Sequence, residues 1–273
     1  MVELGRQTEE AGWDGFFVWD HLAYRDPDAD VADPWMALAA LAGSTERIRL
    51  GVMVCALARR RPWKVARETA SLDLLSEGRL CFGAGLGSLG EQEFEAFGED
   101  PDARVRADRL DEGLEVLTGL WSGEPVDHRG EHFTVRAAGF RPVPVQRPRI
   151  PVWVAGRWPA RRPFRRAARW DGVFPTHREV GQAETMSPDQ LAEIVTYTLA
   201  HRSGTDPFDV AIEGQTPGRD PQADLERVDA YREAGLTWWI ENLGWFRGPL
   251  GEMRSRIEAG PPRSTGAERP AAG

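Results

Sequence analysis

Residues 48–84 read IRLGVMVCALARRRPWKVARETASLDLLSEGRLCFGA, and this stretch decides the fold class. Ile48–Val54 is a short run rich in apolar residues, and Leu80–Ala84 is a second. Between them Pro62 opens a helical pattern over Trp63–Leu75, and proline suits the first turn of a helix. The stretch therefore predicts a strand, a helix and a second strand, which is the unit that builds parallel sheets.

The same alternation continues on both sides of this stretch. Further apolar runs predict strands at Gly15–Trp19, Ile150–Ala155, Gly172–Pro175, Asp209–Glu213 and Thr237–Glu241. Helical patterns are found at Glu3–Ala11, Pro34–Ala42, Arg104–Trp121, Pro188–Ala200 and Pro221–Ala234. Several strand candidates are continuously apolar rather than alternating, which is typical of parallel strands covered by helices on both faces.

Two α/β architectures fit this order, an open doubly wound sheet and a closed (β/α)8 barrel of about 250 residues. An open dinucleotide-binding sheet carries a glycine-rich turn after its first strand. The nearest glycine pattern, GAGLG at Gly83–Gly87, follows a later strand and has a different spacing. We therefore predict an α/β fold of the TIM (β/α)8 type. Because the chain opens on the helix of a strand–helix pair, we expect this barrel to lack its first N-terminal strand.

One barrel domain is expected over residues 1–259. Glu124–Val135 predicts a hairpin, which forms an inserted hairpin and loop near 122–150 together with the proline-rich residues that follow. Residues 260–273 are rich in Gly, Pro, Ala and Arg, and this composition predicts a disordered tail.

The composition excludes several partners. The chain has 273 residues, of which 41% are hydrophobic, and no apolar run approaches the roughly 18 residues of a membrane span. With no signal-peptide pattern at the start, we expect a cytoplasmic protein without membrane attachment. The net charge of -9 argues against nucleic-acid partners, since phosphate backbones need a basic face. Cys55 and Cys81 match no metal or redox motif, so we expect buried thiols.

The active site of such a barrel lies at the carboxyl ends of its strands. Asp20 and His21 follow the first predicted strand and form the strongest candidate pair. A histidine titrates near neutral pH, and a neighbouring carboxylate can fix its tautomer. The alternative is that Asp20 caps the next turn while His21 is an ordinary loop residue.

Other strand exits carry weaker signals. Gly83–Gly90 is a flexible strand exit whose backbone N–H groups could approach a ligand ring or phosphate. Gly156 and Arg157 precede a predicted helix and suggest an anion site. Arg59–Arg61 is either a solvated face or a holder for an acidic cofactor tail. His128 and His132 lack a third ligand, so no metal site is predicted. Two further pairs are candidates to line a substrate pocket, Thr176-His177 and Glu241-Asn242.

Several blocks resemble the luciferase-like flavin-dependent monooxygenases. These are EEAGWDGFFVWDHL (9–22), RRRPWKVARETASLDLLSEGRLCFGAGLG (59–87), LDEGLEVLTGLWSGEPVDHRGEHFTV (110–135) and PVPVQRPRIPVWVAG (142–156). The resemblance covers most of Val2 to Ile240. It implies a TIM barrel that binds FMN or its deazaflavin relative, coenzyme F420, in the barrel mouth.

The resemblance also assigns site residues. It places Met53, Val54 and Cys55 at a bulge behind the flavin ring, which in the family often contains a cis peptide bond without proline. It places Gly85, Gly87 and Ser88 beside the reactive face, and Ala155, Gly156 and Arg157 at the cofactor phosphate. His21 matches a site histidine of the deazaflavin branch, so Asp20 and His21 are the expected catalytic pair.

The predicted function is a monooxygenase that uses reduced flavin and O₂ on a small organic substrate. One alternative is hydride transfer with coenzyme F420 and no O₂, and another is a non-catalytic or vestigial flavin-binding barrel. Certain deazaflavin sugar-phosphate dehydrogenases carry a proton-donating glutamate where this chain has Ser88, which argues against that particular activity. The resemblance further implies a separate flavin reductase and a homodimer as partners.

Overall fold

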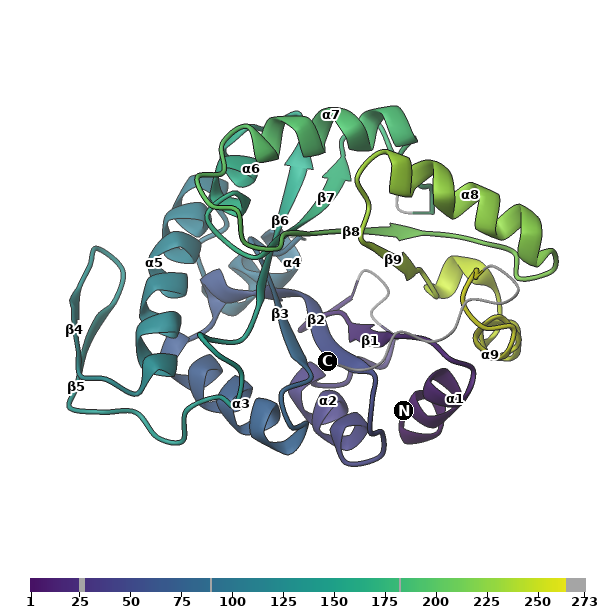
Figure 1. Ribbon diagram of the computed structural model, residues 1–273. Coiled ribbons are helices and arrows are strands. Elements are labelled where there is room, and N and C mark those ends of the chain that lie inside the picture. The colour runs from purple at the N-terminus through teal and green to yellow at the C-terminus, as the bar shows by residue number, and fades with distance from the viewer. Residues whose placement is uncertain (25–27, 89, 182, 264–273) are drawn as a thin grey trace. The chain divides into compact units, whose positions relative to one another are not determined.

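The computed structural model describes residues 1–24, 28–88, 90–181 and 183–263, which form an α/β fold (Figure 1). The chain divides into two compact units. The first comprises Phe16–Val152, and the second combines Val2–Gly15 with the chain from Trp153 onward. The expectation of one domain over residues 1–259 stays a prediction.

The first unit holds the strand–helix–strand stretch that decides the fold class. Its sheet has the order β1-β2-β3, and β2 pairs with β3 in parallel. In chain order its elements are β1 (Gly15–Val18), α2 (Pro34–Ala42), β2 (Arg49–Ala56), η1 (Leu57–Arg59), α3 (Pro62–Leu75), β3 (Leu80–Gly85), α4 (Gly90–Glu93), η2 (Glu95–Phe97), α5 (Ala103–Ser122), β4 (Val126–Arg129) and β5 (Thr134–Ala137).

Aromatic side chains build the core of this unit. Phe82 on β3 is fully buried; its ring stacks on Trp35 of α2 and meets Trp121 of α5 edge-on, with centroids 6.3 and 5.8 Å away. The indole N–H of Trp121 donates to Thr69 Oγ1 on α3 at 2.9 Å, which satisfies the polar edge of a buried ring. The helices α2, α3 and α5 therefore share one apolar core with β3.

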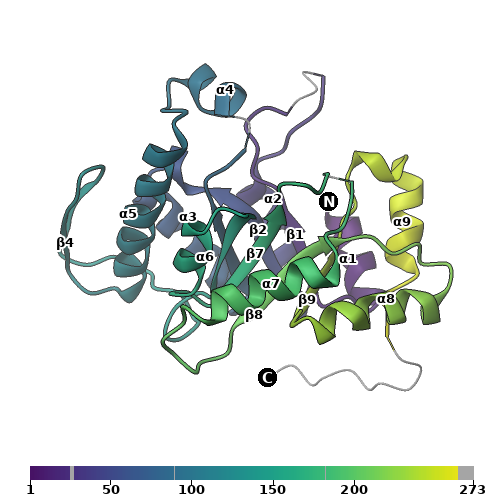
Figure 2. The same ribbon diagram turned by 90° about the horizontal axis from the view of Figure 1, so that it is seen from above.

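The predicted insertion begins with a hairpin. Strands β4 and β5 pair antiparallel beside α5, as Figures 1 and 2 show. Glu112 of α5 anchors this hairpin, because its carboxylate accepts hydrogen bonds from the backbone N–H groups of His132 and Phe133 and contacts His128 Nε2 at 3.0 Å. Two arginine–proline peptide bonds in the loop that follows are cis, Arg141-Pro142 and Arg147-Pro148.

The second unit has four parallel strands in the order β6-β7-β8-β9. Its elements are α1 (Val2–Glu10), β6 (Val152–Trp158), α6 (Arg162–Ala167), β7 (Gly172–His177), α7 (Pro188–Leu199), β8 (Asp209–Gly214), α8 (Pro221–Glu233), β9 (Trp238–Glu241), η3 (Trp245–Arg247) and α9 (Leu250–Glu258). Ser187 caps α7 in a reciprocal capping box with Gln190.

Segments near the two termini contact each other within this second unit. Helix α1 lies against α9, and the indole N–H of Trp13 donates to the carbonyl of Ile257 at 2.9 Å. At the start of the predicted tail, Arg263 Nη2 donates to the Asp14 carboxylate at 2.7 Å, and the expected disorder of residues 260–273 stays a prediction. Residues 264–273 of that tail lie outside the described residues.

The sequence missed some elements and displaced others. Helix α9 was not predicted, since its sequence follows Gly248 and Pro249 and contains Gly251. Strand β6 starts at Val152 rather than at Ile150, and the carbonyl of Pro151 instead accepts from Phe82 N. In the part of the chain that the structure describes, no helix is both long and apolar enough to cross a membrane.

Candidate active site

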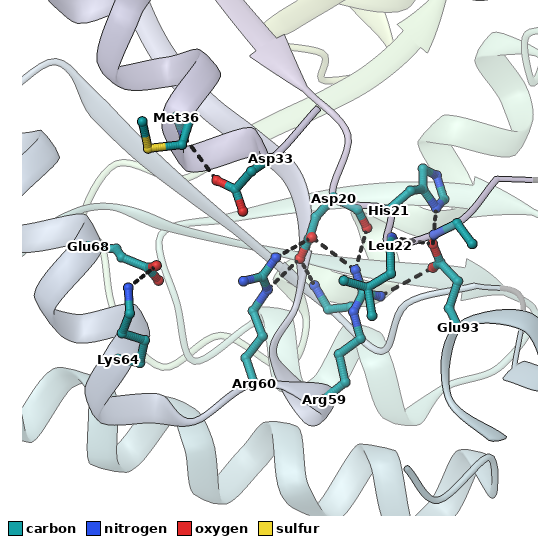
Figure 3. Close-up of polar contacts among 12 residues, drawn as sticks. Asp20, His21, Leu22, Asp33, Met36, Arg59, Arg60, Lys64, Glu68 and Glu93 are labelled. Carbon is teal, nitrogen blue, oxygen red and sulfur yellow. Dashed lines mark hydrogen bonds and ion pairs between the residues drawn. The ribbon is translucent and has the colours of Figure 1, made fainter. Parts of the chain in front are cut away.

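The exit of β1 carries a buried carboxylate, that of Asp20 (Figure 3). Arg60 donates to it through Nε at 2.9 Å and Nη2 at 2.6 Å, and Arg59 Nη2 donates at 2.9 Å. The backbone N–H of Ala56, at the end of β2, donates at 3.1 Å. Asp20 thus joins β1 to the end of β2 and to η1, and the first two arginines of the predicted charge run turn inward to meet it.

Charge keeps this buried carboxylate ionised. Burial alone would raise the pKa of Asp20. The hydrogen bond from Arg60 and the positive charges of Arg60 and Arg59 lower the pKa by more than burial raises it, so the net pKa lies below its usual value. The side chain of Arg59 is only 2% exposed. Arg59 and Arg60 are thus committed to Asp20, whereas Arg61 is exposed, and a role of this arginine run toward an acidic cofactor tail stays a prediction.

His21 meets a different carboxylate from the one expected. Its Nδ1 lies 3.0 Å from Oε1 of Glu93, at the end of α4, and Figure 3 shows the two side chains facing each other. The same oxygen accepts from the backbone N–H groups of Leu22 at 2.8 Å and Ala23 at 3.3 Å. Arg59 Nη1 donates to the second oxygen at 3.2 Å. Asp20 instead bonds to arginines, so the partner of the imidazole is Glu93.

This contact assigns the protons of the imidazole ring. Burial raises the pKa of Glu93, but the hydrogen bond from His21 and the charges of His21 and Arg59 outweigh it, and the net pKa is lowered. An ionised carboxylate only accepts hydrogen bonds, so Nδ1 of His21 carries the proton in this pair. The Nε2 atom is then the nitrogen that can accept a proton. The His21 side chain is 18% exposed, so the ring is not sealed off from solvent.

Strand β2 is irregular where the resemblance predicts a bulge. Its pairing with β3 shifts between Val52 and Cys55, so that Met53 and Val54 together stand opposite Gly83. The Met53–Val54 peptide bond is cis, which confirms the expected geometry. A Cβ atom on Gly83 would lie 2.2 Å from the carbonyl oxygen of Val52, so only glycine fits there.

The loop after β3 lies close to this irregular segment. Gly87 has a positive φ of 76°, and a Cβ atom there would lie 2.8 Å from the Cβ of Ala56 and 3.0 Å from the ring of Phe94. Arg106 of α5 donates to the carbonyls of Leu86 and Gly87 at 3.4 and 3.3 Å. Its guanidinium also lies over the ring of Phe94, 4.6 Å from the centroid. The predicted residue Gly85 therefore ends β3, Gly87 lies on the following loop, which α5 holds in place, and Ser88 is exposed on that loop.

Cys55 contributes no reactive thiol to this site. Its side chain is fully buried, and burial, followed by the charge of Asp20, raises the pKa of the thiol well above its usual value. Both cysteines are free and buried, as predicted. Any contact of Cys55 with a cofactor would therefore be made by its backbone.

The remaining predicted cofactor residues belong to the second unit. Ala155, Gly156 and Arg157 lie on β6, and a Cβ atom on Gly156 would lie 2.7 Å from Pro163. Arg157 is exposed, and its guanidinium donates to the carbonyl of Arg178 at 3.4 Å. Helix α6 is only six residues long, so its macrodipole adds little to an anion site.

Two further predicted pairs are held in local contacts of the second unit. The carboxylate of Glu241 binds Arg247 at 2.6 Å and accepts from the Thr216 hydroxyl at 2.7 Å, while Asn242 Nδ2 donates to Glu213 at 3.1 Å. His177 Nδ1 accepts from the backbone N–H of Glu179 at 3.2 Å. Their expected place beside a substrate remains a prediction.

Sequence reasoning missed Glu93. It stands 72 residues from His21, in a stretch that also offers Glu91 and Glu95, and no spacing rule selects one of the three. The signal that pointed toward it was the strand-exit rule, which brings the ends of β1 and β3 to one edge of a sheet. Within the described ranges, no group of three or more His, Cys, Asp and Glu side chains could hold a metal ion.

Comparisons with known proteins place this chain in a family. The family model of the luciferase-like monooxygenases matches residues 1–242. The chain is 31% identical over 159 residues to the flavin-dependent trigonelline monooxygenase, oxygenase component, of Acinetobacter baylyi, covering 58% of this chain and 43% of that protein. It is 32% identical over 192 residues to the F420-dependent hydroxymycolic acid dehydrogenase of Mycobacterium tuberculosis, covering 68% and 51%.

Among solved structures, an F420-dependent secondary alcohol dehydrogenase in complex with an F420-acetone adduct shares the fold. Its TM-score is 0.73 at 18% identity, over 88% of this chain and 87% of that one. The class is thus an α/β fold shared with that structure, and the chain belongs to the luciferase-like monooxygenase family. It spans about half the length of the two curated relatives described above. Relatives in this family use FMN-type flavin or F420, in agreement with the pair of cofactors expected from the sequence.

Proposed function

We propose that this chain is a flavin-dependent oxidoreductase in which His21 exchanges a proton beside the cofactor. The observation that carries this proposal is the imidazole at the β1 exit, whose Nδ1 proton is committed to a buried carboxylate at 3.0 Å. Oriented imidazoles of this kind serve as general acids or bases. Asp20 would hold the backbone around this site in place, since it joins η1 to the end of β2.

The residues of the first unit fit the ring of a flavin or deazaflavin. Met53 and Val54 stand opposite a single residue of β3, which leaves their backbone groups outside the regular ladder and available to the polar edge of a ring. Gly85, Gly87 and Ser88 would lie beside the ring, and Arg157 would pair with the cofactor phosphate. When bound, the cofactor supplies the electron transfer, and the protein binds, orients and excludes water.

The first candidate reaction is the oxygenation of a small organic substrate by reduced flavin and O₂. Ser88 favours it, because this exposed hydroxyl stands where certain deazaflavin sugar-phosphate dehydrogenases have a proton-donating glutamate. A separate flavin reductase would supply the reduced cofactor, and a homodimer is proposed with it. The parallel strands would belong to a TIM-type barrel, as in the family.

The second candidate is hydride transfer with coenzyme F420 and no O₂. The geometry of His21 favours this reaction, because Nε2 is the nitrogen left to accept a hydroxyl proton as the substrate is oxidised. The dehydrogenase relative and the shared fold of the alcohol dehydrogenase support it too.

Cofactor binding and oxygen dependence test these candidates. Purified protein is titrated separately with FMN and with F420, and turnover is then followed with reduced FMN under O₂ and with F420 plus 2-propanol without O₂. A preference for FMN with O₂ uptake supports oxygenation, and a preference for F420 with anaerobic turnover supports hydride transfer. Binding without turnover under either condition would indicate a non-catalytic flavin-binding protein, and no binding of either cofactor would refute the proposal.

The variant His21→Ala tests the proposed proton exchange. Loss of a general acid or base costs about 10²- to 10⁴-fold in rate, so kcat should fall by that order while the cofactor Kd changes little. The control is His201→Ala, since His201 is exposed in the turn after α7 and its Nδ1 contacts the backbone carbonyl of Tyr197 at 2.9 Å. Unchanged turnover in His21→Ala would remove this residue from the mechanism.

A further inference from the structure

We propose that Glu93 is the positioning residue of His21, holding the proton on Nδ1 so that Nε2 is the reacting atom, and that Arg59 holds Glu93. This inference rests on the proposed function of His21 and adds two residues to that site. It predicts a defined tautomer of the imidazole in the protein without any cofactor.

The contacts of Glu93 fix both the ring and the backbone beside it. Its side chain is fully buried, and Oε1 lies 3.0 Å from Nδ1 of His21. The same oxygen accepts from the N–H groups of Leu22 and Ala23, the two residues that follow the histidine. One carboxylate oxygen therefore sets the position of the loop and the orientation of the imidazole together.

Arg59 connects the Glu93 carboxylate to Asp20. Its Nη1 donates to Oε2 of Glu93 at 3.2 Å, and its Nη2 donates to the Asp20 carboxylate at 2.9 Å and to the Asp20 carbonyl at 2.8 Å. A buried guanidinium that bridges two carboxylates restricts all three side chains, since its Nη1 and Nη2 atoms each form charge-assisted hydrogen bonds to one of them. The carboxylate that orients His21 is therefore itself held rigidly.

The charges around the ring suit a transient imidazolium. Glu93 and Asp20 supply two negative charges, and Arg59 and Arg60 supply two positive charges. The phenol ring of Tyr24 faces the imidazole edge-on with centroids 5.1 Å apart. When Nε2 accepts a proton, the bond from the substrate oxygen to that proton breaks and an N–H bond forms, while Glu93 stays ionised and faces the new positive charge.

The tautomer of His21 is measured first, in the unliganded wild-type protein. The chain has five histidines, so ring nitrogen shifts from a histidine-labelled sample are resolvable, and His21→Asn identifies the relevant signals. In its neutral form His21 should carry the proton on Nδ1 and leave Nε2 unprotonated. A neutral ring protonated on Nε2 would overturn the proposal without reference to any activity.

Glu93→Gln then removes the charge while keeping the shape of the side chain. We expect a mixture of both tautomers at His21 and a kcat lower by about 10- to 100-fold, with KM and cofactor Kd within about threefold, because loss of the orienting carboxylate mainly affects the transition state. Turnover uses reduced FMN with O₂ or F420 with 2-propanol, according to the cofactor that the wild type binds. An unchanged tautomer together with an unchanged kcat would contradict the proposal.

Glu99→Gln is the matched control from the same loop region. Glu99 pairs with Arg109 at 2.8 Å and its side chain is 35% exposed, so the change removes a carboxylate charge outside the contacts among His21, Glu93 and Arg59. Its kcat and its His21 tautomer should equal those of the wild type. If Glu93→Gln does not fold, Arg59→Lys replaces it, since lysine keeps the charge but cannot bridge both carboxylates. A wild type with the Nδ1 tautomer but no turnover would refute the proposed function and leave the positioning contact standing.

Discussion

At the scale of single residues, the site rests on charges that are buried in pairs. Asp20 is buried, and Arg59 and Arg60 have side chains that are 2% and 18% exposed. A buried ion pair is weak evidence for stability in itself, but removal of one partner leaves the other uncompensated. The role of Asp20 therefore differs from that of His21, although the two are neighbours in sequence.

Asp20→Asn should destabilise the protein strongly. The change keeps the shape of the side chain but leaves Arg60 without its carboxylate partner and Arg59 with Glu93 alone, which costs about 3–5 kcal/mol in the free energy of unfolding. Urea unfolding of wild type and variant measures this difference.

The control is Asp229→Asn on α8. Asp229 pairs with Arg232, and both side chains are about half exposed, so the loss should stay below about 1 kcal/mol. Equal losses of unfolding free energy in the two variants would show that the buried ion pairs of Asp20 stabilise the fold no more than an exposed ion pair does.

At the scale of elements, β2 and β3 approach so closely that one position admits only glycine. A Cβ atom on Gly83 would lie 2.2 Å from the Val52 carbonyl oxygen and 2.8 Å from Met53 Sδ. The Val52 carbonyl oxygen cannot move without disturbing the hydrogen bonds of the parallel strands. The irregular segment of β2, Met53 and Val54, therefore requires a glycine opposite it at position 83.

Gly83→Ala should therefore destabilise the first unit and weaken cofactor binding. Forced overpacking of a tight core costs about 1–3 kcal/mol or more, and here the added methyl meets backbone. Gly251→Ala on α9 is the control, because nothing lies within 4 Å of its Cβ position and alanine favours a helix by about 1 kcal/mol. Thermal unfolding of both variants should shift in opposite directions, and similar shifts would contradict this account.

Local patterns predicted these elements better than they predicted the contacts between them. The run around Leu80–Ala84 identified β3, and Pro62 identified the start of α3, because hydrophobic burial and proline geometry act locally. Asp20 and His21 were found by their place after a strand. Glu93 was not found, because its pairing depends on how a short helix returns to the β1 exit, and several glutamates nearby carry the same local signal.

At the scale of the whole molecule, buried carboxylates determine how stability responds to acid. The pKa values of Asp20 and Glu93 are lowered in the folded protein, mainly by hydrogen bonds and by positive charges that outweigh burial, and that of Glu112 is lowered in the same way. Such groups stabilise the fold fully above the unfolded pKa, which is about 3.9 for Asp and about 4.3 for Glu. Their contribution is lost as the pH falls through the lower folded pKa.

The free energy of unfolding should accordingly fall steeply below about pH 4, because these carboxylates must then be protonated. Denaturant titrations at a series of pH values test this. The difference between wild type and Asp20→Asn should shrink over the same acidic range. A difference that is constant down to about pH 2 would show that Asp20 keeps an ordinary pKa.

The contact between Trp13 and Ile257 has a consequence for how the chain folds during its synthesis on the ribosome. The two residues are 244 positions apart, and α1 belongs to the same compact unit as α9. Chains fold largely from the N-terminus as they emerge. Helix α1 therefore cannot dock on α9 until synthesis has passed residue 258, whereas Phe16–Val152 can assemble before that point. Synthesis order and assembly order are thus reversed for α1, which is made before Phe16–Val152 and docks after it.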